Sequence, residues 1–429
     1  GKTAIARAIV ALLAAANIGP IALAAPTGKA AAHMAEVVAS VAAPSGMTLH
    51  RLLEWHPNGF LRNRRAPLGY RAVLIDEASM IDLATMVALV NATPADTRLL
   101  LFGDADQLPS VDSGRVFADI VEASRDRGVA RLTRSFRMRA DNPDGAAILA
   151  MAQAVNQGAA PLSRNKALRL SDPRRSRGGV GWYSPTSDED GARAVLAWCS
   201  QVLDDSAWHN ARQREYALVG EHVTDPDGAL TDMLRVVESR RALAALRGGV
   251  GGTEALNSAI HRHVAASWRG EVVPAFLPGE PVVVTRNDRA LGVHNGDSGV
   301  IARVRDDQAQ RFYVVFARAG GLHGIRLDRL RDHLELAWVT TVHKAQGSEF
   351  DQVALLLPER PSPVITRALV YTALTRARRS ATIIATSKAW DKAVAEVAHR
   401  DSGLCSLLAT PLVGADSAPL PGPQGPDKP

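Results

Sequence analysis

Asp76 and Glu77 directly follow the apolar residues 72–75, a position where two carboxylates could serve phosphate chemistry. Transfer of a phosphoryl group to water needs one carboxylate to hold Mg²⁺ and a second group to orient or deprotonate the attacking water. Adjacent carboxylates just beyond a strand can divide these two tasks. Acidic pairs are also common on protein surfaces, so this pair alone does not establish a site.

The chain begins with Gly1, Lys2 and Thr3, which match the last three residues of a phosphate-binding loop. In such a loop glycine-rich backbone cradles the phosphates, the lysine reaches them, and the hydroxyl binds Mg²⁺. Neither the glycine-rich half nor the strand that should feed it precedes these residues. We therefore expect an N-terminally truncated chain that binds ATP poorly, because the cradling backbone amides are missing.

A second polar cluster, residues 103–109, follows the apolar run 99–102. It contains Gln107, which could sense the terminal phosphate of a nucleotide as switch glutamines do. This cluster beyond a second strand makes a functional interpretation of the acidic pair stronger than a surface one.

The elements that must position these residues can be predicted from apolar periodicity. Residues 3–16 are expected to form a helix and residues 21–25 a buried strand, which is a βαβ unit without its first strand. Apolar runs that end in polar clusters predict a parallel sheet with helices on both faces. From residue 271 to 334, short strands separated by turn residues predict a small antiparallel β barrel inserted into the α/β part.

These patterns predict an α/β fold with more than one domain, as a length of 429 residues also indicates. The expected boundaries are 1–125 for the first domain with a hairpin insertion near 55–70, 126–268 and 336–410 for the second, and 269–335 for the β insertion. Residues 411–429 are rich in proline and glycine and are expected to be disordered.

Composition narrows the class of protein. The net charge of +6 favours a polyanionic partner, although only weakly. Cys199 and Cys405 match no metal or redox spacing, and a secreted disulfide-built fold is not expected. The alanine-rich residues 9–23 are too short and too weakly apolar to span a membrane. We therefore expect a cytoplasmic protein with no membrane partner.

Six segments resemble motifs of superfamily 1 helicases, in the same order and with similar spacing. They correspond to motifs Ia, II, III, IV, V and VI and lie at residues 25–31, 76–82, 103–111, 132–137, 342–350 and 371–377. Residues 48–53, 285–288 and 295–297 are similar to the RecD family, the alpha chains of exodeoxyribonuclease V (RecBCD). The resemblance covers nearly the whole chain, and only the truncated first motif departs from it.

This resemblance implies two RecA-like P-loop NTPase domains with an SH3-like insertion. It also implies ATP and Mg²⁺ as cofactors. The implied activity is 5′-to-3′ translocation on single-stranded DNA with unwinding of duplex DNA, and the DNA partner would be single-stranded DNA or a duplex end. RecB-like and RecC-like subunits would be the protein partners, in double-strand break repair and recombination. The sequence shows no nuclease constellation, so nuclease activity would come from a partner.

The resemblance assigns roles around the nucleotide. Lys2 would contact the β and γ phosphates, Asp76 and Thr3 would bind Mg²⁺, and Glu77 would activate water. Gln107 would couple the phosphate state to domain closure. The residues expected to bind the nucleotide are Gly1, Lys2, Thr3, Asp76 and Glu349, the last of them at the sugar, where an exposed acidic residue is an equal alternative.

Arg137 and Arg376 would reach across from the second domain and stabilise charge on the transferring phosphoryl group, because a guanidinium donates bidentately and stays charged. The residues expected to contact DNA are Pro26, Thr27, Thr341 and His343. They would contact the DNA backbone, so binding should depend strongly on salt. His343 could equally be a packed core residue.

A predicted hairpin turn at Asn58 and Gly59 precedes three arginines, Arg62, Arg64 and Arg65. The resemblance implies a hairpin that helps to separate strands, and a solvated basic loop is an equal alternative. Three functions remain open at this point: a RecD-type helicase subunit, a stand-alone relative, and a DNA-binding scaffold that no longer hydrolyses ATP.

Overall fold

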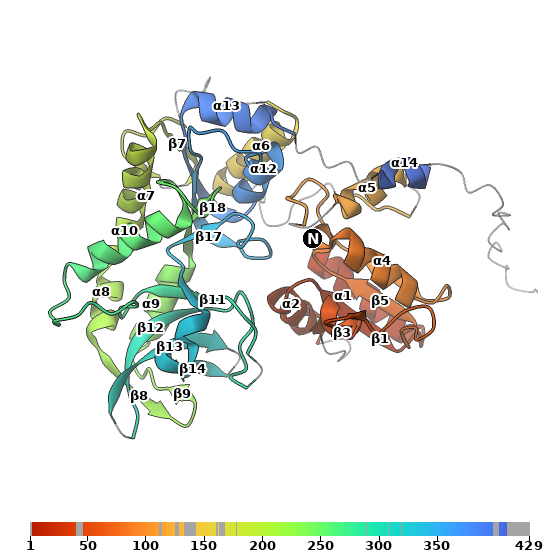
Figure 1. Ribbon diagram of the computed structural model, residues 1–429, viewed down its shortest axis with the longest axis horizontal. Helices are drawn as coiled ribbons and strands as arrows, with labels where there is room; N and C mark the ends of the chain where they lie inside the picture. Colours follow the sequence, from red (N-terminus) through yellow and green to blue (C-terminus); the bar gives the residue numbers. More distant parts are fainter. Residues whose placement is uncertain are drawn as a thin grey trace, which may run out of the picture.

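The computed structural model describes residues 2–39, 46–110, 114–124, 128–132, 143–159, 162, 168–176, 178–288, 290–307, 309–318, 320–397 and 403–409. Two predicted site residues, Gly1 and Arg137, lie outside this part of the chain, as does the expected tail at 411–429. Figure 1 shows two α/β units side by side, the first in red and orange and the second in yellow, green and blue. The predicted α/β class with two parallel sheets is confirmed.

The first unit is a four-stranded parallel sheet between helices. Its strands in sheet order are β2 (Gly46–Thr48), β1 (Ile21–Ala25), β5 (Ala72–Ile75) and β6 (Arg98–Leu101). Successive residues of β5 face opposite sides, so Leu74 packs with α1 (Lys2–Ala15) and α2 (Gly28–Val38), and Ile75 packs with α4 (Leu83–Ala92). Burial on both faces explains why the strand is continuously apolar.

Smaller elements complete this unit. They are α3 (Leu49–Leu52), η1 (Ala78–Met80) and α5 (Val116–Ala123), with the two-stranded hairpin of β3 (Trp55–His56) and β4 (Gly59–Phe60). The predicted hairpin forms one residue earlier than expected: Pro57 and Asn58 make its turn, and Gly59 opens β4 with a positive φ of 123°, which suits glycine. Trp55, at its base, has an exposed fraction of 54%.

The second unit has five parallel strands and helices on both faces. In sheet order the strands are β16 (Val339–Thr341), β10 (Arg240–Ala244), β17 (Phe350–Leu356), β18 (Ala377–Ile384) and β7 (Gly179–Tyr183). The helices are α6 (Pro143–Asn156), α7 (Asp188–Leu203), α8 (Ser206–Gln213), α9 (Ala229–Glu238), α10 (Thr253–Ala265), α12 (Arg367–Leu374) and α13 (Ser387–Ala395), with η4 (Pro173–Arg175). On β17, Leu356 packs in the core that holds α7 and α10, and Leu355 packs in the core that holds α6 and α12.

The β-rich unit is larger than the predicted insertion at 269–335. Its elements are β8 (Glu215–Val219), β9 (His222–Val223), β11 (Pro281–Val284), β12 (Ser298–Arg305), β13 (Gln310–Arg318), β14 (Gly321–Arg326), β15 (Leu334–Leu336), α11 (Leu327–Leu330) and η5 (Arg331–His333). Strand pairing runs β12–β13–β14–β9–β8 and returns to β12, so five strands close a cycle. The predicted boundary missed β8 and β9, because their pairing partners lie about a hundred residues later in the chain.

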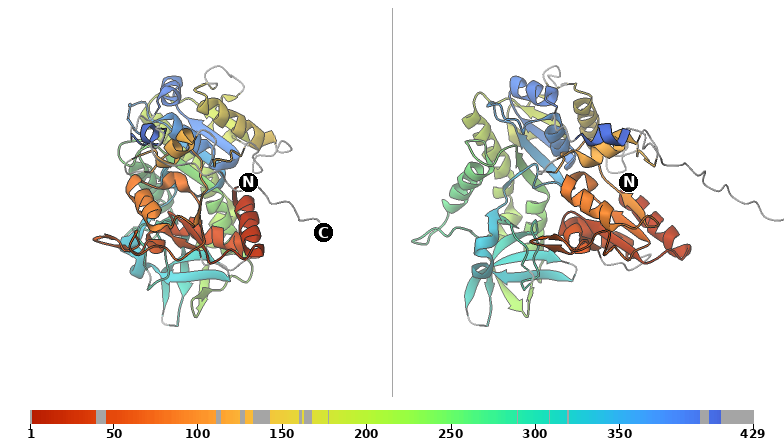
Figure 2. Two further views of the ribbon diagram at one scale, coloured as in Figure 1. Left: turned by 90° about the vertical axis from the view of Figure 1, so that its right-hand side faces the viewer. Right: turned by 45° about the vertical axis from the view of Figure 1, so that its right-hand side comes forward.

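The end of the described chain returns to the first unit. Helix α14 (Leu404–Ala409) packs against α5, as Figures 1 and 2 both show. Leu404 contacts the core of the first unit. The second domain was predicted to run to residue 410, but the structure places residues 404–409 against the first unit. Within the described part of the chain, no helix has both the length and the apolar character that crossing a membrane requires.

A buried carboxylate joins the β-rich unit to the second α/β unit. Glu280, which is fully buried just before β11, accepts a hydrogen bond from the backbone N–H of Leu277 at 2.8 Å. It also lies 3.0 Å from Nδ1 of His261 on α10 and accepts from Nε1 of Trp338 at 3.4 Å. Trp338 lies between β15 and β16, so the connections that enter β11 and leave β15 meet at Glu280.

Stability should depend on pH through this contact. The hydrogen bond to Glu280 raises the pKa of His261, although partial burial and the nearby Arg262 oppose the shift. Because the pKa is higher in the folded state, the stabilisation should be complete below about pH 6.5. It should then be lost as pH rises through the folded-state pKa. His261→Gln should lower the free energy of unfolding by about 1 kcal/mol below about pH 6.5, and by less above the folded-state pKa of His261.

Urea unfolding of both proteins across pH would measure this difference. The matched control is His263→Gln, because His263 is exposed on the same helix. The guanidinium of Arg212 also interacts with Glu280 and is itself opposed by the charge of Arg303. A His261→Gln deficit that grows with pH would contradict the assignment.

Candidate nucleotide site and domain interface

The acidic pair lies at the carboxyl end of β5, as predicted. Glu77 adopts a left-handed backbone conformation, with φ 51° and ψ 41°, which is uncommon for a residue other than glycine. Its N–H donates to Oδ1 of Asp76 at 2.9 Å. This turn directs the chain into η1 directly after the sheet edge.

The side chains of Asp76 and Glu77 are partly buried and therefore poorly solvated. Oε2 of Glu77 is buried and has no hydrogen-bond partner among the described residues. Burial raises the pKa of Asp76, while the positive charge of Lys2 acts in the opposite direction. A buried carboxylate with few protein partners is suited to a cation or a polarised water.

Lys2 opens α1, so its charge lies at the same edge of the sheet as Asp76. Thr3 follows it and is half-buried. Hydroxyl and carboxylate oxygens are ligands that Mg²⁺ accepts, and Mg²⁺ bound with a nucleotide needs only one or two carboxylates from the protein. Thr3 and Asp76 therefore fit the ion chemically. No group of three or more metal-ligating side chains was found in the described part of the chain, which this mode of binding does not require.

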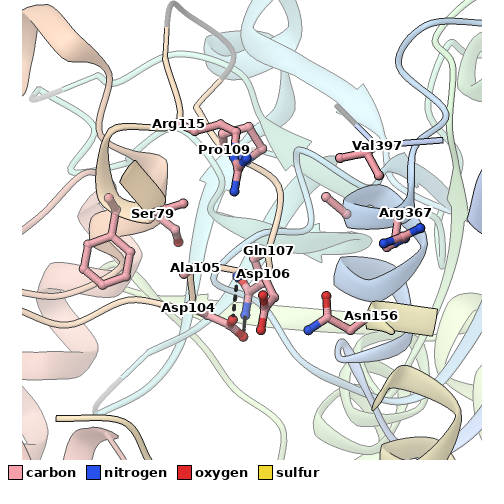
Figure 3. Close-up of a pocket in the computed structure, with 13 residues that line it drawn as sticks. Ser79, Asp104, Ala105, Asp106, Gln107, Pro109, Arg115, Asn156, Arg367 and Val397 are labelled. Carbon is pink, nitrogen blue, oxygen red and sulfur yellow. Dashed lines mark hydrogen bonds between the residues drawn. The ribbon is translucent and has the colours of Figure 1, made fainter. Parts of the chain in front are cut away.

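Gln107 lies between the two units, close to Asp104. Its Nε2 donates to Oδ2 of Asp104 at 2.9 Å, and this same oxygen accepts from the Tyr371 hydroxyl of the second unit at 3.2 Å. Oε1 of Gln107 is buried and has no partner among the described residues. Figure 3 shows Asp104, Gln107 and Asp106 together on one wall of a pocket.

Both units line this pocket. The first unit contributes the strip from Asp104 to Gln107 with Arg115, and the second contributes Asn156 and Arg367. Asp106 accepts a hydrogen bond from Asn156, and burial together with Asp104 raises the pKa of Asp106. The shape of the pocket therefore depends on how the two units are placed relative to each other.

The second unit forms hydrogen bonds with both the backbone N–H and the backbone carbonyl of Leu108. Its N–H donates to Oγ1 of Thr372 on α12 at 2.8 Å, and its carbonyl accepts from Nε2 of Gln346 at 2.8 Å. All these contacts are buried. We call this pair of hydrogen bonds the Leu108 latch. It connects the residue after Gln107 to two segments of the second unit.

Arg376 is buried at the end of α12 and is held by its own unit. It donates from Nε to the carbonyl of Thr372 at 3.2 Å and from Nη1 to that of Ser348 at 3.2 Å. Glu349 accepts from Nε of Arg378 at 3.1 Å. The structure therefore places Arg376 and Glu349 in the second unit near the interface but does not bring them to Asp76.

The expected DNA contacts lie on facing parts of the two units. Pro26 and Thr27 precede α2, and the Thr27 side chain accepts from the backbone N–H of Ala30 at 3.2 Å as a helix cap. Thr341 ends β16 on the second unit, His343 lies two residues later, and both are half-buried. Thr341 also caps locally, accepting from the N–H of Lys344 at 3.2 Å.

One exposed contact joins these two parts. Nζ of Lys29 donates to Oγ of Ser348 at 3.1 Å across the interface. Of the basic residues after the hairpin, Arg62 pairs with Glu54 at 2.6 Å, and Arg64 donates to Asn91 at 2.9 Å.

The sequence did not single out several residues that the structure places at the interface. These are Asp104, Lys29, Gln346, Tyr371 and Thr372, all of which lie inside segments that resemble helicase motifs. Their positions in those segments were visible, but their roles depend on which side chains meet across the two units.

Two family models match this chain. The AAA domain covers residues 1–113, which include Asp76, Glu77 and Gln107. The UvrD-like helicase C-terminal domain covers residues 336–384, which include Gln346, Tyr371 and Arg376. The two matches therefore fall on the two sides of the interface just described.

Curated relatives match over most of the chain. The chain is 33% identical to the RecBCD enzyme subunit RecD of Mycolicibacterium smegmatis, over 95% of its own length and 70% of the relative. It is 34% identical to the same subunit of Mycobacterium tuberculosis, over 90% and 64% of the two lengths. It is 31% identical to the ATP-dependent RecD2 DNA helicase of Deinococcus radiodurans, over 95% and 48%.

Proposed function

Because this chain belongs to the RecD family of ATP-dependent DNA helicases, we propose that it is the ATP-hydrolysing motor of a 5′-to-3′ single-stranded DNA translocase and helicase. It spans 64% to 70% of the mycobacterial relatives, so the activity proposed is that of the complete protein. The observation that supports it most directly is the buried Oε2 of Glu77, which has no hydrogen-bond partner among the described residues and lies beside Asp76, where Lys2 also acts.

In the proposed mechanism, ATP is the substrate and lies between the units. Lys2 binds the phosphates, and Glu77 takes a proton from the attacking water. Thr3 and Asp76 would hold Mg²⁺, which neutralises charge on the phosphates when bound. Gln107 responds to the γ phosphate, and the Leu108 latch passes its movement to the second unit.

Arg137 and Arg376 are proposed to stabilise the transferring phosphoryl group when the units close. Arg376 would have to exchange its backbone acceptors for phosphate oxygens, a change within reach of a small closing movement because it lies at the interface. Glu349 is proposed to bind the nucleotide sugar, and Gly1 to belong to the phosphate-binding loop.

DNA is proposed to pass between Pro26 and Thr27 on one unit and Thr341 and His343 on the other. The Lys29–Ser348 contact crosses the same interface and would open to admit a strand. The five-strand cycle is proposed to be the SH3-like insertion of two RecA-like domains. The proposed partners are RecB-like and RecC-like subunits, as in the RecBCD enzymes of the relatives' names, in the cytoplasm.

Unwinding of two tailed duplexes would test the proposed direction. We expect the full-length protein to unwind a duplex with a 5′ single-stranded tail in the presence of Mg-ATP, and to leave a matched 3′-tailed duplex paired. Unwinding only from the 3′ tail would contradict the direction. DNA binding with no ATP hydrolysis, alone or with partner subunits, would favour the scaffold alternative.

A further inference from the structure

We propose that Tyr371 is a positioning residue for ATP hydrolysis, which orients Gln107 from the opposite unit by sharing the Asp104 carboxylate with it. The inference rests on the proposed function and deepens it. It identifies a contact by which the position of the second unit controls a side chain at the nucleotide.

Asp104 is the centre of this arrangement. Its Oδ1 accepts from the backbone N–H of Asp106 at 3.1 Å, which fixes the carboxylate in the turn. Its Oδ2 accepts from Nε2 of Gln107 at 2.9 Å and from the Tyr371 hydroxyl at 3.2 Å. One oxygen atom therefore joins the two units, with a neutral donor from each.

The carboxylate decides which way the Gln107 amide points. An ionised carboxylate only accepts hydrogen bonds, so the amide nitrogen must face Asp104. The amide oxygen then points away, and this is the buried Oε1 that lacks a partner among the described residues. In this orientation Gln107 presents an acceptor, which can receive a hydrogen bond from a water molecule beside the γ phosphate.

The Tyr371 hydroxyl is suited to act as a constant donor. Burial and the negative charges of Asp104 and Asp106 raise its pKa, although Arg376 opposes the shift. The hydroxyl thus stays protonated at neutral pH. Tyr371 also precedes Thr372 of the Leu108 latch on α12, so a movement of α12 changes both contacts together.

The consequence for the reaction is specific. Without the hydroxyl, Oδ2 of Asp104 loses one of its two side-chain donors, so the carboxylate oxygen and the Gln107 amide bound to it are held less firmly. The rate of hydrolysis on DNA should fall, whereas the affinity for ATP should not, because neither Tyr371 nor Asp104 is placed on the nucleotide.

Tyr371→Phe tests this inference because it keeps the ring and removes only the hydroxyl. We expect kcat of DNA-stimulated ATP hydrolysis by the full-length protein to fall about twofold to tenfold, the range of one ordinary hydrogen bond, with KM for ATP unchanged. The matched control is Tyr313→Phe, which removes a hydroxyl that donates to Asp306 at 2.8 Å inside the β-rich unit.

A double-mutant cycle with Gln107→Ala separates positioning from packing. If Tyr371 acts through Gln107, Tyr371→Phe should have no further effect on kcat in the Gln107→Ala protein. Equal fold losses in both backgrounds would overturn the inference, as would an unchanged kcat in Tyr371→Phe. Wild-type hydrolysis that DNA fails to stimulate would instead overturn the proposed function.

Discussion

In the full-length protein, Glu77→Gln should reduce DNA-stimulated ATP hydrolysis by about a hundredfold to ten-thousandfold, the usual contribution of a positioned general base. Glutamine keeps the size and one acceptor oxygen of the side chain but cannot take a proton from water. Because glutamine has the size of glutamate and no described residue donates to the buried Oε2, the substitution should leave the fold intact. Steady-state hydrolysis with saturating single-stranded DNA measures the effect.

Mg-ATP binding should persist in the same variant, because Lys2 and Asp76 are unchanged. Equilibrium binding of a fluorescent ATP analogue would measure this. The matched control is Glu122→Gln, since Glu122 is exposed on α5 of the same unit and is expected to have no effect. Hydrolysis within threefold of wild type in Glu77→Gln would move the general base elsewhere, with Asp76 as the next residue to replace.

Breaking the Leu108 latch should give the second large effect. Thr372→Val together with Gln346→Leu removes both side-chain partners of Leu108 and leaves its N–H buried without an acceptor. An unsatisfied buried group costs about 1–3 kcal/mol, which corresponds to roughly a fivefold to 150-fold loss in the population of the engaged interface. We expect DNA stimulation of hydrolysis to fall in that range.

The control for this pair is Thr382→Val. Thr382 is buried in β18 of the same unit, and its hydroxyl has no hydrogen-bond partner among the described residues. The loss of a hydroxyl there should not affect coupling. Measuring unwinding and hydrolysis on the same DNA would show whether the latch couples them. If both activities stayed at the wild-type level in the double variant, the latch would have no role in coupling.

The local order of residues was enough to predict the first half of the site. Asp76, Glu77 and Gln107 each follow an apolar run, and parallel strands bring their carboxyl ends to one edge of a sheet. The structure places all three where that rule predicts. The hairpin was likewise predictable to within one residue, because a two-residue turn depends on local sequence; its turn residues are Pro57 and Asn58.

The second half of the site depends on contacts between distant segments. Leu108 meets Gln346 and Thr372 across 238 and 264 residues, and no local periodicity encodes such a pairing. The same holds for β8, which joins the β-rich unit by pairing with β12. Thr27 was expected only as a DNA contact, yet it also caps α2, a role that needs its backbone geometry to be seen.

Short stretches of the sequence therefore determined which functional groups lie at the site, but they did not determine the contacts that couple the two units. Which carboxylates and amides lie beyond each strand follows from residue order and from the geometry of parallel sheets. Gln107 meets Asp104 within one short turn, whereas Tyr371 reaches the same oxygen only because of how the two units pack together. Packing of this kind selects among side chains that are far apart in sequence, so it is decided only when the chain has folded.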